Sequence, residues 1–224
     1  MSKRTQLIAA ALAVGCLTTC SAPVPEAPPA ASTLFAEPWN SGLSRQEPMF
    51  QTQPLDGDTL VIRQSINATF EAPFLYLLVG RKRALLIDTG VEGADLRAEV
   101  DRLIEAWRSA NGREAVSLVV MHSHCHGDHV GGDSGFAGRA DTVVVGHSAE
   151  AVAGFFGITA WPSQSAAFDL GDRIVDIVPT PGHHPSHVMV FDRATGILFS
   201  GDTIYPGRLY FQCSSLEEYR GSID

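Results

Sequence analysis

The feature that constrains this chain most is the segment Ser123–His129, in which three imidazoles and one carboxylate fall within six residues. It follows Val116–Met121, an apolar run that predicts a buried strand. All eight histidines lie between His122 and His187, a clustering not expected of histidines that serve only in packing. Imidazole and carboxylate ligands without thiolate suit zinc, iron or manganese. The sequence therefore predicts a metal site of catalytic type at the end of a strand.

Length and composition narrow the class of protein. The chain has 224 residues, of which 45% are hydrophobic, and this is enough for the core of one ordinary domain. Its formal net charge of −9 disfavours a duplex nucleic-acid partner, which would require a basic face, although metal ions could bind phosphate in a nuclease. We therefore expect the substrate to be a small molecule and do not expect the protein to bind nucleic acid. We infer no protein partner.

The N-terminus has the pattern of a targeting segment. Lys3 and Arg4 precede an apolar stretch from Leu7 to Leu17, which is too short to span a bilayer. Cys20 follows in a sequence similar to a bacterial lipobox, with Cys16 as the alternative lipidation site. We expect a lipoprotein that is anchored to a membrane or lies in the bacterial periplasm, hence extracytoplasmic; a simple secretory signal is the alternative.

We divide the chain into a signal peptide (1–20), a Pro/Ala-rich tether with an irregular lead-in (21–58) and a folded domain (59–224). A helix is expected over residues 94–110, where apolar residues recur on one face. Strands are expected over residues 59–65, 73–80, 84–88, 116–121, 142–145, 173–179, 187–191 and 196–200. This mixture, with polar ligands at strand ends, is typical of layered α/β proteins.

Four motifs in order resemble those of the metallo-β-lactamase superfamily. They are the His-rich segment Ser123–His129, an early Asp motif at Leu85–Gly90, a Gly-His motif at Thr180–His183 and a later Asp motif at Ser200–Thr203. The resemblance covers roughly residues 59 to 210. It implies an α/β fold of the αββα sandwich type.

The resemblance also implies which side chains bind metal. Two divalent ions are expected, with zinc first and iron or manganese as alternatives. The implied ligands are His124, His126 and His183 for one ion, Asp128 and His129 for a second, and Asp202 as a bridge. Two such ions hold a bridging water and lower its pKa toward ~7, which generates a hydroxide nucleophile at neutral pH.

Two further residues are expected to support these ligands rather than bind metal. Asp88 would fix the orientation of a ligand imidazole, although it could also simply close a strand and cap a turn. His187 is expected in a supporting or structural role.

The remaining histidines and cysteines are interpreted as non-ligands. His122, His147 and His184 are expected to be packed or surface residues. Cys125 lies between two proposed ligands, so a disulfide with Cys213 would strain the metal loop, and we expect free thiols.

The chain departs from the family pattern at its C-terminus. The family places a further histidine there to complete the second metal site, but no histidine follows His187, and Leu216–Asp224 reads as the start of a helix. We expect a truncated sequence that lacks the last strand and helix and has an incomplete second metal site. A shortened single-metal variant or an inactive fragment is the alternative.

The expected activity follows from Asp202 and Tyr205. Many true β-lactamases of the superfamily have Cys or Ser where this chain has Asp202, and the Asp resembles the glyoxalase II and lactonase branch. Tyr205 stands three residues later, as in acyl-homoserine lactonases, where the phenol polarises a carbonyl or protonates a leaving group. Packing with Tyr210 and Phe211 is the other explanation for it.

We therefore expect a metallo-hydrolase in which a metal-bound hydroxide cleaves an ester, thioester or lactone, with Asp128 and Tyr205 as the catalytic side chains. Hydrolysis of β-lactams is the first alternative. A metal-binding redox module is the alternative of a different class.

Overall fold

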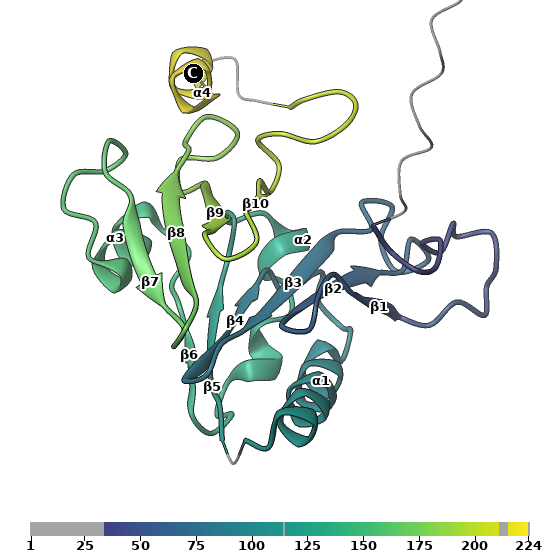
Figure 1. Ribbon diagram of the computed structural model, residues 1–224. Helices are drawn as coiled ribbons and strands as arrows, with labels where there is room; N and C mark the ends of the chain where they lie inside the picture. The colour runs from purple at the N-terminus through teal and green to yellow at the C-terminus, as the bar shows by residue number, and fades with distance from the viewer. Residues whose placement is uncertain (1–33, 114, 211–214, 224) are drawn as a thin grey trace, which may run out of the picture. The chain divides into compact units, whose positions relative to one another are not determined.

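The computed structural model describes residues 34–113, 115–210 and 215–223. Within these ranges, strands form one six-stranded and one four-stranded sheet (Figure 1). The first sheet contains β1 (Phe50–Pro54), β2 (Thr59–Gln64), β3 (Phe74–Val79), β4 (Arg83–Ile87), β5 (Ser117–Met121) and β6 (Thr142–Val144), in that order. The second has the order β10 (Ile197–Phe199), β9 (Val188–Asp192), β8 (Ile174–Pro179), β7 (Ala166–Asp169).

The direction of the strands decides where polar side chains gather. β1 to β4 pair antiparallel, whereas β4, β5 and β6 are parallel neighbours. Ile87 at the end of β4 is in register with Met121 at the end of β5. The residues that follow these two strands therefore emerge side by side at one edge of the sheet.

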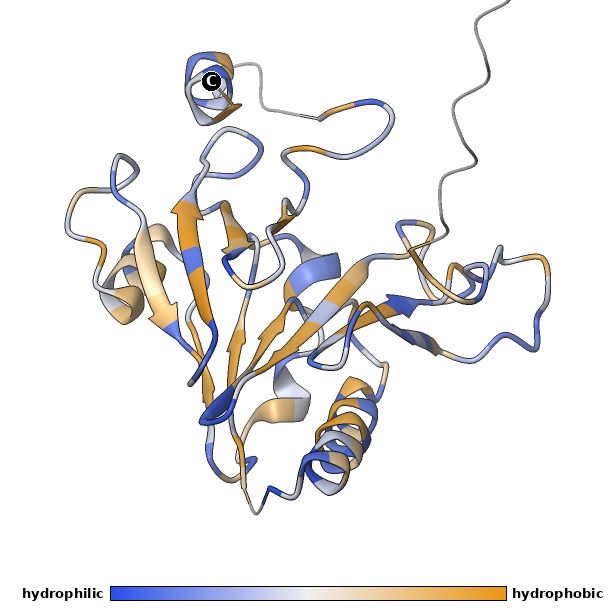
Figure 2. Cartoon of the chain, in the orientation of Figure 1, coloured by the Kyte–Doolittle hydropathy of each residue, from blue (hydrophilic) through white to orange (hydrophobic). Residues whose placement is uncertain are grey.

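The central strands are buried on both faces. On β4, Ala84 and Leu86 belong to a core shared with helix α1 (Leu96–Asn111), while Leu85 and Ile87 belong to a second core that includes residues of β8 and β9. Because side chains alternate along a strand, a continuous apolar run can serve two cores at once. Figure 2 shows this hydrophobic character along the central strands. These two stacked sheets confirm the expected layered α/β class.

Helix α1 confirms the helix expected over residues 94–110, with its start at Leu96 and its end at Asn111. Its carboxyl-bearing N-cap, Asp95, accepts a hydrogen bond from the backbone of Ala98, and Gly112 ends the helix with a positive φ of 62°. The predicted apolar stripe is buried: Leu96, Val100, Leu103, Ile104 and Trp107.

The structure corrects the sequence analysis at several short elements. The lead-in, expected to be irregular up to residue 58, contains β1, which pairs with β2 along its whole length. β1 is a half-exposed edge strand that contains two glutamines and ends in proline, so its apolar alternation is weak. β7 and helix α3 (Ala149–Phe156) were also not expected. The remaining helices are α2 (Gly127–Val130), a 3₁₀ turn η1 (Asp133–Phe136) and α4 (Leu216–Ile223).

Other expectations concern the ends of the chain and the cysteines. Cys125 is a free cysteine, as expected, whereas Cys213 lies outside the described residues. Cys16, Cys20 and the whole predicted signal peptide also lie outside them. Among the helices that are described, none combines the length and apolar character needed to cross a bilayer.

Candidate metal centre

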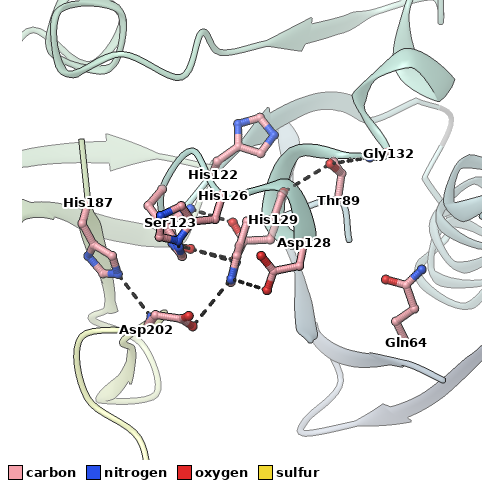
Figure 3. Close-up of polar contacts among 12 residues, drawn as sticks. Gln64, Thr89, His122, Ser123, His126, Asp128, His129, Gly132, His187 and Asp202 are labelled. Atoms are coloured by element: carbon pink, nitrogen blue, oxygen red, sulfur yellow. Dashed lines mark hydrogen bonds and ion pairs between the residues drawn. The ribbon is translucent and has the colours of Figure 1, made fainter. Parts of the chain in front are cut away.

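The predicted site residues come together where strand ends meet. Asp88 follows β4, the segment Ser123–His129 follows β5, His183 lies in the loop between β8 and β9, and Asp202 follows β10. The structure thus brings all six proposed ligands into one region, which supports their assignment as a single centre. Figure 3 shows several of them, with Asp128, His129 and Asp202 facing one another.

His124, His126 and His183 form the first group of converging nitrogens. Nε2 of His124 lies 2.8 Å from Nδ1 of His126, which lies 3.1 Å from Nε2 of His183. Ring nitrogens this close, with lone pairs directed at one another, repel unless a cation or a proton lies between them. Three imidazole nitrogens are a donor set suited to zinc, so the residues present fit a divalent metal ion.

Neighbouring groups fix which nitrogen of each ring is free. Nδ1 of His183 donates to the backbone carbonyl of Tyr210 (2.6 Å), and Nδ1 of His124 lies 3.0 Å from the hydroxyl of Ser123. These contacts leave both Nε2 atoms available as ligands. Burial, followed by the nearby His129, lowers the pKa of His124, and burial followed by His183 lowers the pKa of His126. Both rings are therefore neutral at pH 7, as a metal ligand must be.

Asp128, His129 and Asp202 form the second group. Nε2 of His129 lies 3.2 Å from Oδ2 of Asp128 and 3.6 Å from Oδ1 of Asp202. The other oxygen of Asp202 lies 3.7 Å from Nε2 of His183, so this carboxylate faces both groups. Among the described residues, this second group offers one imidazole and two carboxylates. It therefore has fewer nitrogen ligands than the first group, which has three imidazoles.

The second group carries excess negative charge. Burial lowers the pKa of His129, but Asp88, Asp128 and Asp202 together outweigh burial and raise the pKa to about 12. Burial likewise raises the pKa of Asp128 and of Asp202, but the adjacent His129 outweighs it and holds the pKa of each carboxyl below its usual range. The ionised carboxylates of Asp128 and Asp202 favour a positive charge beside them, which the protonated His129 supplies here and a divalent cation would supply in its place.

Asp88 and Ser123 hold the second group in place. Asp88 accepts hydrogen bonds from the backbone N–H and the hydroxyl of Ser123 (2.6 and 2.9 Å), and its Oδ2 lies 2.8 Å from Nδ1 of His129. These contacts orient the His129 ring so that Nε2 points to Asp128 and Asp202. Sequence analysis anticipated the position of Asp88 but overlooked Ser123, although Ser123 belongs to the His-rich motif.

His187 supports the loop that carries Asp202. It is fully buried, its Nδ1 lies 2.9 Å from the hydroxyl of Thr180, and its Nε2 accepts from the backbone N–H of Asp202 (3.2 Å). Gly201 makes this approach possible: a Cβ there would lie 2.8 Å from Nε2 of His187 and 2.8 Å from Cβ of Ser123. A glycine is therefore required beside Asp202.

A cavity of about 1070 Å³ opens over both groups. His126, Asp128, His129, His183 and Asp202 contribute to its floor, and Tyr205 is among its lining residues. The other lining side chains include Arg63, Phe70, Phe74, Tyr76, Ile204 and Tyr210. Burial, followed by Asp202, raises the pKa of Tyr205, which keeps the phenol protonated at neutral pH. The second residue of the packing alternative, Phe211, lies outside the described residues.

The three histidines expected to be non-ligands lie in two different places. His184 stays near the first group, with its ring centroid 5.2 Å from that of His126, and its Nδ1 lies 2.9 Å from the hydroxyl of Ser186. His122 and His147 both contact Asp133, a residue that sequence analysis did not single out.

Comparison with known proteins agrees with this arrangement. A family model described as "Metallo-beta-lactamase superfamily" matches residues 68–218. A hydroxyacylglutathione hydrolase of Pseudomonas putida is 29% identical over 154 residues, which cover 63% of this chain and 52% of the relative. An acyl-coenzyme A thioesterase, MBLAC2 of Gallus gallus, is 27% identical over 207 residues, which cover 76% of this chain and 72% of the relative. The chain thus spans about half the length of the first of these curated relatives.

Solved structures share the fold. A metallo-beta-lactamase from Pontibacter korlensis aligns with a TM-score of 0.53 and 19% identity, covering 78% of this chain and 83% of that protein. A metallo-beta-lactamase family protein from Thermus thermophilus gives the same TM-score and identity, with coverages of 76% and 69%. Since the family model spans more than half of the chain, the protein belongs to the metallo-beta-lactamase superfamily.

Proposed function

We propose that this protein is a metal-dependent hydrolase of thioesters. The observation that carries the proposal is the shared cavity, in which both groups of proposed metal ligands meet Tyr205 and an aromatic wall. The relatives favour thioesters over the broader range of esters and lactones, because one is named for hydrolysis of hydroxyacylglutathione and the other as a thioesterase.

His124, His126 and His183 would hold one divalent ion, and Asp128, His129 and Asp202 a second, with zinc first and iron or manganese as alternatives. Ions bound there would supply Lewis acidity and lower the pKa of coordinated water.

The chain's own side chains would then position the reactants. Asp128 is ionised and lines the cavity, so its carboxylate can accept a hydrogen bond from the attacking water and orient it. The protonated phenol of Tyr205 can donate to the acyl oxygen or to the departing sulfur. Attack by water on the acyl carbon forms the C–O bond, breaks the C–S bond and releases a carboxylic acid and a thiol.

Arg63 gives the cavity a means of selecting among thioesters. It is the one Lys or Arg among the described residues that line the cavity, and its guanidinium lies 5.7 Å from the ring centroid of Phe74. A cation at an aromatic wall favours a leaving thiol that carries a carboxylate or phosphate.

A substrate panel with zinc-loaded protein tests the proposal. The panel contains an acyl-coenzyme A, an S-acyl glutathione, an aryl ester, an N-acyl homoserine lactone and a chromogenic cephalosporin. We expect kcat/KM to be highest for a thioester by at least about tenfold, equivalent to ~1.4 kcal/mol of transition-state stabilisation. The highest value for the aryl ester, the lactone or the cephalosporin would contradict it. The His126→Ala variant serves as the metal-site control.

A further inference from the structure

A second cluster of metal-ligating side chains lies outside the cavity. Nε2 of His122 lies 2.7 Å from Oδ1 of Asp133, and Nε2 of His147 lies 2.7 Å from Oδ2 of the same carboxylate. The two imidazole rings are nearly perpendicular, at 87°, with centroids 4.7 Å apart. None of these three described residues is among those that line the cavity over the catalytic groups.

The fold builds this cluster from three separate segments. His122 follows β5, Asp133 begins the 3₁₀ turn η1, and His147 lies between β6 and α3. β5 and β6 are parallel, with Val120 in register with Val144, so the two histidines emerge at the same edge. Figure 3 shows the His122 ring directed away from Asp202 and His129. The cluster is therefore separate from the side chains that line the cavity, although His122 is only two residues from His124 in the sequence.

The cluster is shielded from solvent at His122 and accessible to solvent at Asp133 and His147. The side chain of His122 is only 3% exposed, whereas those of Asp133 and His147 are 20% and 34% exposed. Nδ1 of His122 is buried without a hydrogen-bond partner, so this ring has its polar contact at Nε2, toward Asp133. The hydroxyl of Thr89 also donates to Oδ1 of Asp133 (2.8 Å), which fixes the carboxylate between the rings.

We propose that His122, Asp133 and His147 form an additional site for a divalent transition metal, with zinc as the best match. Two imidazoles and one carboxylate are a set that zinc commonly binds, with solvent in the remaining position. Their ligand atoms all lie within 4.8 Å of one another. Ligand atoms around one tetrahedral zinc are about 3.3 Å apart, given bonds of roughly 2.0–2.2 Å. Small rotations of the partly exposed His147 and Asp133 side chains therefore suffice to admit the ion.

The same contacts could also be a hydrogen-bonded triad in which both imidazoles donate to Asp133. Metal stoichiometry separates the two. The full chain is stripped with a chelator and titrated with zinc against a chromophoric competitor, and bound zinc is confirmed by elemental analysis. We expect His147→Ala and Asp133→Asn each to bind one equivalent less than the unaltered protein at saturation.

Asp101→Asn is the matched control for Asp133→Asn. Asp101 is also a partly buried carboxylate between two basic side chains, but its partners are Arg97 and Arg139, which cannot bind metal. This control should bind as much zinc as the unaltered protein. Far-ultraviolet circular dichroism of the metal-free forms shows whether each variant is folded.

A second arm excludes an indirect effect on the catalytic groups. In a His124→Ala, His126→Ala background, the zinc that remains should fall by one equivalent when His147→Ala is added. Equal zinc binding by the unaltered protein and His147→Ala would overturn the proposal. The proposal would also be overturned if His147→Ala removed one zinc equivalent from the unaltered protein but none from the His124→Ala, His126→Ala background. The lost ion would then belong to the groups that line the cavity.

Discussion

Oδ2 of Asp88 lies 2.8 Å from Nδ1 of His129, and this contact joins the end of β4 to helix α2. The backbone of Asp88 has a positive φ of 68°, a conformation that few residues other than glycine, asparagine and aspartate adopt readily. The chain therefore places an acidic residue where the backbone turn and the orientation of a proposed ligand imidazole both depend on it.

Asp88→Asn tests this role without disturbing the turn, because asparagine tolerates the same φ. The amide keeps the size of the side chain but replaces one acceptor oxygen with a donor. We expect zinc affinity to fall by about 10- to 100-fold, the usual effect of losing a group that orients a metal ligand. Zinc titration of the metal-free protein measures this change.

Asp141→Asn is the matched control, since Asp141 also has a positive φ, of 52°, but is exposed and lies outside the centre. It should leave zinc affinity unchanged. Equal affinities for Asp88→Asn and the unaltered protein would show that Asp88 serves only the strand end and its turn.

His126→Ala tests the three-histidine group, because Nδ1 of His126 is the nitrogen that approaches both of the others. We expect the loss of one zinc equivalent and of detectable hydrolysis. His184→Ala removes an imidazole whose ring is 5.2 Å from that of His126 but which is not in the group, and it should retain the metal. Full zinc occupancy in His126→Ala would refute the ligand assignment.

Tyr205→Phe tests the proposed donor in the cavity. If the phenol donates to the acyl oxygen or the leaving group, kcat should fall by roughly 10- to 1,000-fold while zinc content stays the same. Tyr210→Phe is the control: Tyr210 lines the same cavity, and it contacts His183 through its backbone carbonyl, which the substitution preserves. An unchanged kcat in Tyr205→Phe would show that the phenol does not take part in the reaction and that Tyr205 serves only in packing.

That the proposed ligands lie just beyond strand ends could be predicted from the sequence for a physical reason. Each lies in a short polar motif just beyond an apolar run, and apolar runs that serve two cores are read reliably as buried strands. Once β4 and β5 are taken as strands, the proximity of Asp88 to Ser123–His129 follows from their parallel pairing. The sequence also indicated helix α1, because its apolar stripe is long and regular.

Other parts could not be predicted because their signals are tertiary. β7 has four residues, and α3 has a single buried residue, Val152, so neither shows a strong apolar periodicity. The convergence of His122 and His147 on Asp133 depends on the pairing of β5 with β6 and on the path of η1. Nothing local distinguishes Asp133 from the other 24 acidic residues, because the chain has 25 in all.

A buried ion pair in the second sheet, which also contacts the first sheet, gives a prediction for stability. Asp192 at the end of β9 is fully buried and accepts two hydrogen bonds from Arg173, 2.7 and 3.2 Å long. Arg173 also donates to the hydroxyl of Thr59 at the start of β2 (2.6 Å). Removing one partner of such a pair leaves an uncompensated buried charge.

We expect Asp192→Asn to lower the free energy of unfolding by about 3–5 kcal/mol. The control is Asp176→Asn, which breaks the exposed pair with Arg193 and should cost at most about 1 kcal/mol. Urea unfolding followed by circular dichroism measures both. Metal-free protein is used, so that metal release at low pH does not contribute.

The effect of Asp192→Asn should also depend on pH. Burial raises the pKa of Asp192, but hydrogen bonds from Arg173 and Thr195 outweigh burial and hold the pKa below its usual range. A carboxyl whose pKa is depressed in the folded state contributes its full stabilisation above the unfolded pKa, and loses it as the pH falls through the folded pKa. The difference in unfolding free energy between the unaltered protein and Asp192→Asn should therefore be largest near neutrality and shrink in acid. A difference that stays constant from neutral to acidic pH would mean that the cost comes from packing rather than from the ionised pair.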